Sequence, residues 1–425
     1  MKNTLALVLI LLVLDLKAQN IKEELYNLPD VQFKKISTPE SYKAAYELKI
    51  KQAIDHNDPS KGHFYQRVFL SHMGFDHPTV MVTNGYSKSK NSITEVATLL
   101  QANQLNIEHR FFGKSMPDSL DYNYLNLEQA TADLHHINEV FRKIYSAKWI
   151  STGISKGGQT TIFYRYFFPN DVDVSIPYVA PINEGLEDKR IYTFLDTVGT
   201  DECRAKIKAI QKRLLSDREK VLPLMRWYTY GAQLNFSYLE FEQAFEYTVL
   251  EFPFSFWQWG SDCEELPEAD APLEEVLYYF VSVSGIDFFA DKSMDEFASH
   301  YYQAGAQMGY YGYDITEFKD LIIALSNDKN PSAVFMPNKM SLQFNNEVVI
   351  KAKAWMKKNG NRFIHINGNS DTWSATALRP VKGIDAEWFF LADKDHGAAR
   401  IKNMTEAERE RMIAALEKWL EMEIS

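Results

Sequence analysis

The sequence has little cysteine, and after its first twenty residues it has no long hydrophobic run. Only Cys203 and Cys263 occur among 425 residues. In an oxidising compartment such a pair is more simply a disulfide than a catalytic thiol. No stretch beyond the N-terminus is long and apolar enough to cross a bilayer, so no membrane span is expected.

Signatures of metal and nucleotide chemistry are also missing. The sequence contains no His-Glu-x-x-His motif, no P-loop and no dinucleotide fingerprint, so neither a metal nor an organic cofactor is expected. Basic residues number 46 against 57 acidic ones, a net charge of −11. This balance argues against a nucleic-acid partner and is compatible with a cationic ligand such as a peptide amino terminus. The oligomeric state stays open.

The first nineteen residues have the pattern of a secretory signal peptide. A short positive start at residues 1–3 precedes an unbroken apolar run from Leu5 to Leu14 and a polar stretch containing Ala18. This run is too short for a membrane span. We expect cleavage after Ala18 or Gln19, and no cysteine follows that could carry a lipid. The mature protein should therefore be exported, either to the periplasm or to the medium.

The remaining chain is long for a single core, so a domain with a large insertion is expected. Residues 62–182 carry strand and helix patterns in alternation, and the alternation returns after residue 337, which predicts a mostly parallel sheet flanked by helices. We assign this core to residues 20–182 and 338–425. Residues 183–337 are rich in charged and aromatic helix-like segments and predict a helical cap. The predicted strands are 64–70, 79–83, 105–112, 148–152, 172–179, 363–367 and 386–391. The predicted helices are 92–102, 127–144, one from 156, 345–358 and 405–420.

Two helix starts carry capping signals. Asn126 precedes the helix at 127, and Gln129 is placed to bond back to it. Thr405 precedes the last helix, and Glu408 completes a capping box there.

The segment Gly153-Ile154-Ser155-Lys156-Gly157-Gly158 lies between a predicted strand and a predicted helix. That context is the one a nucleophile elbow requires: the serine sits on a tight turn, and small residues two positions before and after allow close backbone approach. An ordinary glycine-rich turn is the alternative. We interpret Ser155 as a nucleophile and the fold as an α/β-hydrolase.

A serine nucleophile needs a base and an orienting acid, in the chain order Ser, Asp or Glu, His. His396 follows the last strand and precedes the last helix, where the base is expected. His300 falls in the helical cap and His365 within a strand. Asp371 follows the strand 363–367 and lies 25 residues before His396. The rivals Asp393 and Asp395 lie on the histidine's own loop and are better explained as turn residues.

An oxyanion hole would use two backbone N–H groups. One should belong to Lys156, the residue after the nucleophile. The second should come from Asn84-Gly85-Tyr86, where glycine allows the backbone to approach a substrate carbonyl. A plain turn explains this loop equally well.

Several segments resemble exported serine peptidases related to prolyl carboxypeptidase, and within them the prolyl tri/tetrapeptidyl aminopeptidases of secreting bacteria. The resemblance covers about residues 60 to 400. It rests on 108–115 (Glu-His-Arg-Phe-Phe-Gly-Lys-Ser), 153–158, 198–204 and 256–263. It implies a triad of Ser155, Asp371 and His396 and release of short peptides from free N-termini, preferably after proline. One departure is Thr372, where the family commonly has proline between the acid and tryptophan.

A peptidase of this kind needs a carboxylate for the substrate ammonium and an apolar pocket for the residue before the cut. Glu187 and Asp188 are our candidates for the first, and Trp257 and Trp259 for the second. A solvated acidic turn and ordinary core aromatics are the alternatives. Other functions also stay open: a dipeptidyl peptidase, a prolyl carboxypeptidase, a carboxylesterase or lipase on the same triad, and an inactive binding module.

Overall fold

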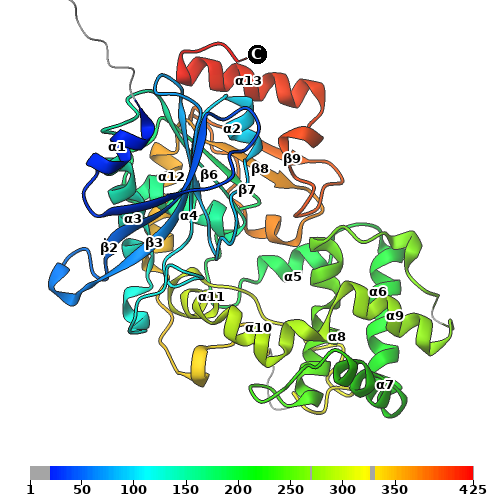
Figure 1. The fold of residues 1–425 in the computed structure, drawn as a ribbon. Helices are drawn as coiled ribbons and strands as arrows, with labels where there is room; N and C mark the ends of the chain where they lie inside the picture. Colours follow the sequence, from blue (N-terminus) through cyan, green and yellow to red (C-terminus); the bar gives the residue numbers. More distant parts are fainter. Residues whose placement is uncertain (1–19, 269, 326–330, 425) are drawn as a thin grey trace, which may run out of the picture.

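The structure, a computed structural model, describes residues 20–268, 270–325 and 331–424. The predicted signal peptide, residues 1–19, lies outside the described residues. The described chain forms a sheet domain with a helical cap packed beneath one end of the sheet (Figure 1). The helical cap is the segment 183–337, between the seventh and eighth strands.

One sheet of nine strands forms the centre of the sheet domain, in the order β1-β2-β3-β5-β4-β6-β7-β8-β9. The first three strands and β5 pair antiparallel, and all pairs from β5 to β9 are parallel. The strands are β1 Val31–Lys35, β2 Ala44–Ala53, β3 His63–His72, β4 Thr79–Thr83, β5 Asn103–Ile107, β6 Trp149–Ile154, β7 Val174–Tyr178, β8 Ile364–Gly368 and β9 Glu387–Leu391.

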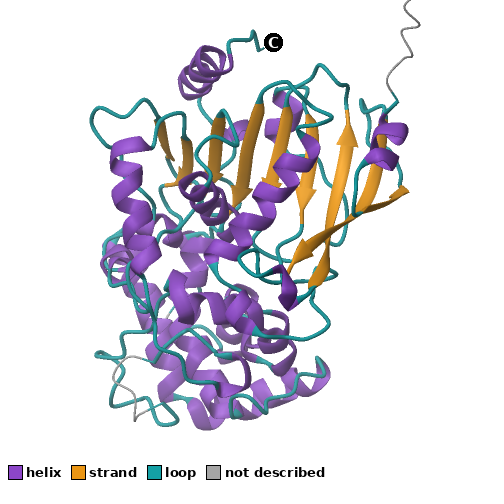
Figure 2. Ribbon diagram, turned by 90° about the vertical axis from the view of Figure 1, so that its left-hand side faces the viewer, coloured by secondary structure: helices purple, strands orange, loops and turns teal. Residues whose placement is uncertain are grey.

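Helices cover both faces of this sheet, so that three layers result (Figure 2). Leucine, isoleucine and valine of the central strands face α2 and α13 on one side and α3, α4 and α12 on the other. Parallel strands buried on both faces are continuously apolar for this reason. The helices of this domain are α1 Ile21–Asn27, α2 Glu95–Leu99, α3 Leu127–Phe141, α4 Lys156–Phe167, α12 Glu347–Asn359 and α13 Glu406–Leu420.

The two capping signals had different outcomes. The box at α13 is confirmed, because Thr405 and Glu408 each accept a hydrogen bond from the other's backbone. At α3, Asn126 Oδ1 accepts the Gln129 N–H at 2.9 Å. The Gln129 side chain does not bond back: it donates to Asp55 and accepts from the His56 N–H. A neighbouring loop thus competes successfully for the amide that the box would need.

The helical cap is built around α8, the longest of the helices described. Pro253 within α8 has no N–H, and the Val249 carbonyl that it leaves free accepts from Gln211 Nε2 at 2.8 Å. The helices of the helical cap are α5 Arg190–Leu195, α6 Asp201–Ser216, α7 Arg218–Gly231, α8 Phe241–Gln258, α9 Leu273–Val283, α10 Asp291–Glu296 and α11 Ala298–Gln303.

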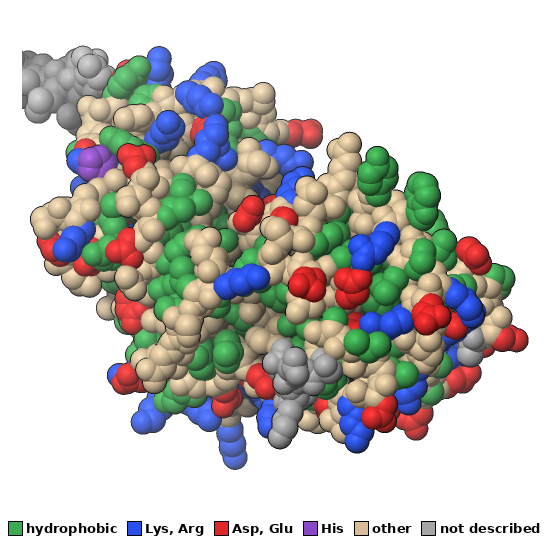
Figure 3. Space-filling model, turned by 90° about the horizontal axis from the view of Figure 1, so that it is seen from below, with side chains coloured by type: hydrophobic (Ala, Val, Ile, Leu, Met, Phe, Trp, Pro, Cys, Tyr) green, Lys and Arg blue, Asp and Glu red, His purple; other side chains and the backbone are tan. Residues whose placement is uncertain are grey.

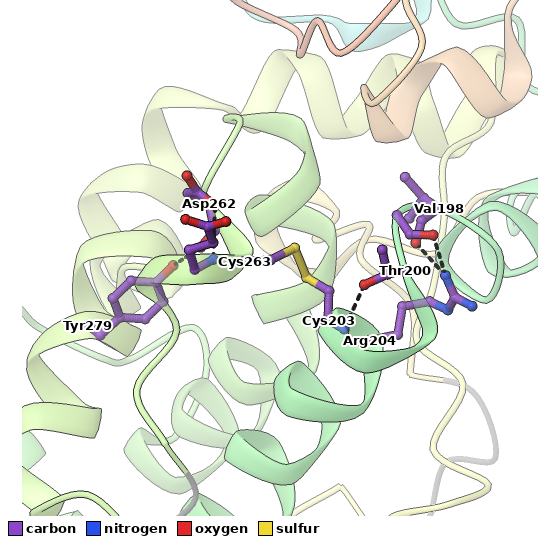
Figure 4. Close-up of a disulfide and its surroundings, with 9 residues drawn as sticks. Val198, Thr200, Cys203, Arg204, Asp262, Cys263 and Tyr279 are labelled. Atoms are coloured by element: carbon purple, nitrogen blue, oxygen red, sulfur yellow. Dashed lines mark hydrogen bonds between the residues drawn. A yellow bond between two sulfur atoms is a disulfide. The ribbon is translucent and has the colours of Figure 1, made fainter.

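Cys203, at the start of α6, forms a disulfide with Cys263, which follows α8 (Figure 4). The bond closes a chain separation of 60 residues and ties two helices of the helical cap together. Thr200 caps α6 beside it by accepting the Cys203 N–H.

Seen from below, the molecule exposes acidic and basic side chains interspersed with hydrophobic ones (Figure 3). No single-sign field dominates this face, although the whole sequence is acidic. Within the described residues, none of the helices combines the length and hydrophobicity needed to span a bilayer.

Candidate active site

Ser155 occupies a strained turn between β6 and α4. Its φ of 59° and ψ of −125° are rare for a residue with a side chain. The turn is close-packed, because a Cβ at Gly153 would lie 2.2 Å from the Gly157 carbonyl oxygen and one at Gly157 would lie 2.6 Å from that of Thr83. Glycine is therefore required at both positions, as a nucleophile elbow demands.

His396 and Asp371 are brought together from two different loops. His396 Nδ1 lies 2.9 Å from Asp371 Oδ2, and Asp371 is fully buried. The other carboxylate oxygen, Oδ1, accepts the Trp373 N–H at 3.1 Å. This geometry orients the imidazole so that Nε2 is left for another partner. Asp395, one of the rivals considered above, instead accepts the N–H groups of Gly397 and Ala398 as a turn residue.

Ser155 and His396 line one cavity of about 530 Å³ between the sheet domain and the helical cap. This volume lies within the range of small-ligand sites, about 300–1,000 Å³. The carboxyl ends of five strands supply its floor, through Tyr86, Ser155, Pro181, Trp373 and His396. Residues of the helical cap form the opposite wall.

Two other histidines considered above are buried and remain neutral near pH 7. His365 stacks between Phe363 and Trp388, and burial lowers its pKa to about 3. His300 lines the cavity, and burial together with the nearby Lys156 lowers its pKa to about 3. Neither has a carboxylate partner within the described residues.

The predicted oxyanion loop lies directly against the residue after Ser155. A Cβ at Gly85 would fall 2.6 Å from the Lys156 Cβ. Lys156 Nζ donates to the Gly85 carbonyl at 2.6 Å, while burial lowers the pKa of this lysine well below its ordinary value. The Lys156 N–H is the first of α4, so no intrahelical acceptor exists for it. Lys156 and Tyr86 both line the cavity.

The four residues proposed for substrate binding have different positions. Trp259 lines the cavity, with its ring centroid 5.9 Å from that of His396. Trp257 instead packs against Gly199 and lines a second cavity of about 210 Å³ inside the helical cap. Neither Glu187 nor Asp188 lines the cavity that contains Ser155.

Local partners explain why those two acids lie elsewhere. Arg190 forms a bidentate pair with Asp188, at 2.9 and 2.6 Å, and Asp188 also accepts the Glu184 N–H. Tyr192 donates to Glu187 at 2.6 Å. Both carboxylates thus fix the chain where it enters the helical cap.

Sequence reasoning missed Glu251, a buried acid that lines the cavity, and Asp287, an exposed one. Glu251 on α8 lines it together with Tyr301, Tyr310 and Tyr311. The one signal in the sequence was an acid flanked by Leu250 and Phe252 in a strongly aromatic segment.

Helix α8 is attached to the loops of both the acid and the base. Thr372 Oγ1 donates to the Phe254 carbonyl at 3.0 Å, and the His396 N–H donates to the Gln258 carbonyl at 3.0 Å. The Trp373 ring packs edge-on against Phe254. Thr372 therefore has a physical role that the proline of the usual family pattern could not fill, because proline has no hydroxyl.

Comparisons with known proteins relate this chain to peptidases. A family model described as PS-10 peptidase S37 matches residues 14–423. The prolyl tri/tetrapeptidyl aminopeptidase of Streptomyces mobaraensis is 29% identical over 408 residues, which cover 94% of this chain and 85% of that protein. Prolyl carboxy peptidase like protein 5 of Caenorhabditis elegans is 28% identical over 142 residues, 30% of this chain and 28% of that protein.

Among solved structures, the proline iminopeptidase of Mycobacterium smegmatis is 12% identical, with a TM-score of 0.42, and the match covers 88% of this chain and 97% of that one. The family resemblance stated from the motifs is confirmed by the family model and the Streptomyces relative. The chain belongs to the PS-10 peptidase S37 family and is a serine peptidase of the α/β-hydrolase fold.

Proposed function

We propose that this protein is an exported exopeptidase that releases tripeptides or tetrapeptides from free N-termini, after proline, through Ser155, His396 and Asp371. The observation that carries the proposal is the shared cavity: Ser155 and an Asp371-bound His396 line the same space beneath the helical cap. The similarity to the Streptomyces aminopeptidase over 94% of the chain supports the substrate class.

The proposed chemistry is acyl transfer from the peptide to Ser155 and then to water. His396 Nε2 accepts the Ser155 hydroxyl proton while Ser155 Oγ attacks the peptide carbonyl carbon. The tetrahedral intermediate collapses, the C–N bond breaks, and His396 gives the proton to the leaving amine. Water then attacks the acyl-enzyme, with His396 again as base, and releases the short peptide as a carboxylate. Asp371 orients the imidazole and stabilises its cationic form throughout.

The oxyanion of each intermediate would be held by backbone N–H groups of Lys156 and of the Gly85–Tyr86 turn. The close contact between Gly85 and Lys156 supports this assignment, since it places the two chain segments side by side. Trp259, beside His396, offers an apolar surface for the proline ring that precedes the cut.

The test compares the wild-type protein with Ser155→Ala on four chromogenic substrates. These are Ala-Ala-Pro-anilide with a free and with an acetylated N-terminus, Gly-Pro-anilide, and a short-chain nitrophenyl ester. We expect rapid cleavage of the free-amine tripeptide alone among the anilides, and its loss in Ser155→Ala. Ester hydrolysis without any peptide hydrolysis would contradict the proposal and leave an esterase.

Export is the second part of the proposal, and the Cys203–Cys263 disulfide supports it because such bonds persist in oxidising compartments. Expression in a bacterial host followed by fractionation and mass spectrometry tests it. We expect a periplasmic or secreted product beginning at Gln19 or Asn20. A full-length product confined to the cytoplasm would contradict export.

A further inference from the structure

Glu251 is a buried carboxylate in the wall of the cavity that contains Ser155. Its side chain belongs to α8 and the residue is only 5% exposed. Burying an ionised carboxylate is costly unless a cation or a full set of hydrogen bonds compensates. The question that Glu251 raises is therefore what compensates its charge.

Other buried acids of this protein have cationic partners. Glu246, on the same helix, pairs with Arg218 and accepts the N–H groups of Ile323, Ala324 and Leu325. Asp133 forms a bidentate pair with Arg110, at 2.7 and 2.8 Å. Glu251 has no ion pair within the part of the chain that the structure describes.

Among the described residues, the hydrogen-bond donors to the Glu251 carboxylate are all neutral hydroxyl groups. Ser255 donates to Oε1 at 3.1 Å, and Tyr311 and Tyr313 donate to Oε2 at 2.9 and 2.6 Å. A carboxylate has about four acceptor positions, two on each oxygen. The two tyrosines occupy those of Oε2, so one position of Oε1 remains for a ligand in the cavity.

Of Glu251 and the described tyrosines that face it, the carboxylate is the group whose pKa lies near neutrality. The tyrosines that face it are Tyr301 of α11 and Tyr310, Tyr311 and Tyr313 of the following segment, and burial raises the pKa of each well above its ordinary value. They remain protonated donors. Burial raises the pKa of Glu251 to about 7, against the effect of its three hydrogen bonds.

The position of Glu251 relative to the triad is fixed by α8. The Phe254 carbonyl of this helix accepts a hydrogen bond from Thr372, the residue after the acid Asp371. The Gln258 carbonyl accepts one from the backbone of His396, the proposed base. A cation bound at Glu251 would therefore be held at a set separation from Ser155.

We propose that Glu251 binds the protonated α-amino group of the peptide substrate and thereby limits how many residues precede the cut. The ammonium group would donate to Oε1 and supply the cationic partner that Glu251 lacks among the described residues. This inference rests on the proposed exopeptidase function and assigns the N-terminus recognition that Glu187 and Asp188 do not provide. The exposed Asp287, which also lines the cavity, is the rival acid.

The test measures kcat/KM for Ala-Ala-Pro-anilide with a free and an acetylated N-terminus, with nitrophenyl acetate as a readout of an intact triad. The variants are Glu251→Gln, Glu251→Asp and Asp287→Asn, with Glu242→Gln as the matched control. Glu242 lies on the same helix but pairs with Arg226, away from the cavity. Thermal melting shows whether each variant is folded.

We expect Glu251→Gln to lower kcat/KM for the free-amine peptide about 100-fold, the effect of losing a desolvated charge pair. The acetylated peptide and the ester should change by no more than about threefold, since neither uses that pair. Glu251→Asp should keep part of the free-amine preference, and Glu242→Gln all of it. A peptide with an acetylated N-terminus and an added lysine distinguishes recognition of the α-amino group from recognition of a side-chain ammonium.

Four results would overturn the assignment. Three are an unchanged free-amine preference in Glu251→Gln, a loss of that preference in Asp287→Asn instead, and an equal loss on both peptides in Glu251→Gln. The fourth is rapid cleavage of the acetylated peptide that carries lysine, which would indicate recognition of a side-chain ammonium. Failure of the wild type itself to cleave any peptide while hydrolysing the ester is a different result: it overturns the proposed function and this assignment together.

Discussion

The sheet domain and the cavity wall of the helical cap differ in how they hold a buried acid. In the sheet domain, Asp133 is paired with Arg110 and Asp371 with His396, so each acid is held in one orientation. On the cavity side of the helical cap, Glu251 is surrounded by hydroxyl groups and aromatic rings, without a cation. The difference indicates that the sheet domain is organised for the reaction and the helical cap for recognition of a charged ligand.

The largest expected effect belongs to the sheet domain. Asp371→Asn should lower kcat by about 10⁴-fold on peptide and ester alike, because an asparagine favours the wrong imidazole tautomer. Steady-state kinetics on both substrates, with circular dichroism to verify folding, measure it. A loss restricted to peptides would contradict a role for Asp371 in the chemistry.

Glu246 should behave as a purely structural acid of the helical cap. Glu246→Gln leaves the half-buried Arg218 without its counter-ion, so we expect a loss of about 3 kcal/mol in the free energy of unfolding, the low end of the range for a broken buried pair. Urea denaturation measures this loss. Activity per folded molecule should stay unchanged, and a selective loss of the free-amine preference would remove the contrast with Glu251.

The next largest effect on the free energy of unfolding should come from the disulfide. It closes a loop across 60 residues between α6 and the end of α8. We expect the double variant Cys203→Ser, Cys263→Ser to lose about 2–4 kcal/mol of unfolding free energy, chiefly because the unfolded chain gains freedom. Equal melting of the variant and the wild type under oxidising conditions would contradict this.

The smallest expected effect is a gain in stability rather than a loss, and it concerns Glu251→Gln. The pKa of Glu251 is raised to about 7 in the folded state, so the wild type loses stability as pH rises from the unfolded value, near 4.5, through 7. Glu251→Gln avoids this loss and should be more stable than wild type at pH 8 by about 1–3 kcal/mol. The gain should shrink toward pH 5, and thermal melting at both values measures it. A gain independent of pH would show that ionisation is not its cause.

Much of the sheet domain could be predicted because its signals are local. The range of β4 was predicted as observed, and the turn at Ser155 followed from glycines two residues away on either side. The edge strand β1 and its neighbour β2 were not predicted. Charged side chains such as Lys34, Lys35 and Glu47 interrupt their apolar pattern, as is common at exposed sheet edges.

The proposed recognition site at Glu251 could not be predicted, because its contacts join residues that are far apart in the sequence. Glu251 depends on Tyr311 and Tyr313, sixty residues farther along the chain, and no spacing rule connects them. Glu187 and Asp188 were attractive candidates because they follow a strand end. Their partners Arg190 and Tyr192 are close in sequence, but sequence alone does not tell an engaged carboxylate from an open one.

The most direct test of the account is the identity of the peptide that the enzyme releases. A decapeptide beginning Ala-Ala-Pro, with a free and with an acetylated N-terminus, is digested and the products are identified by mass spectrometry. The account predicts that Ala-Ala-Pro and the complementary heptapeptide form far faster from the free form than from the acetylated one, with no product in Ser155→Ala. Removal of residues from the C-terminus, or equal cleavage of both forms, would contradict it.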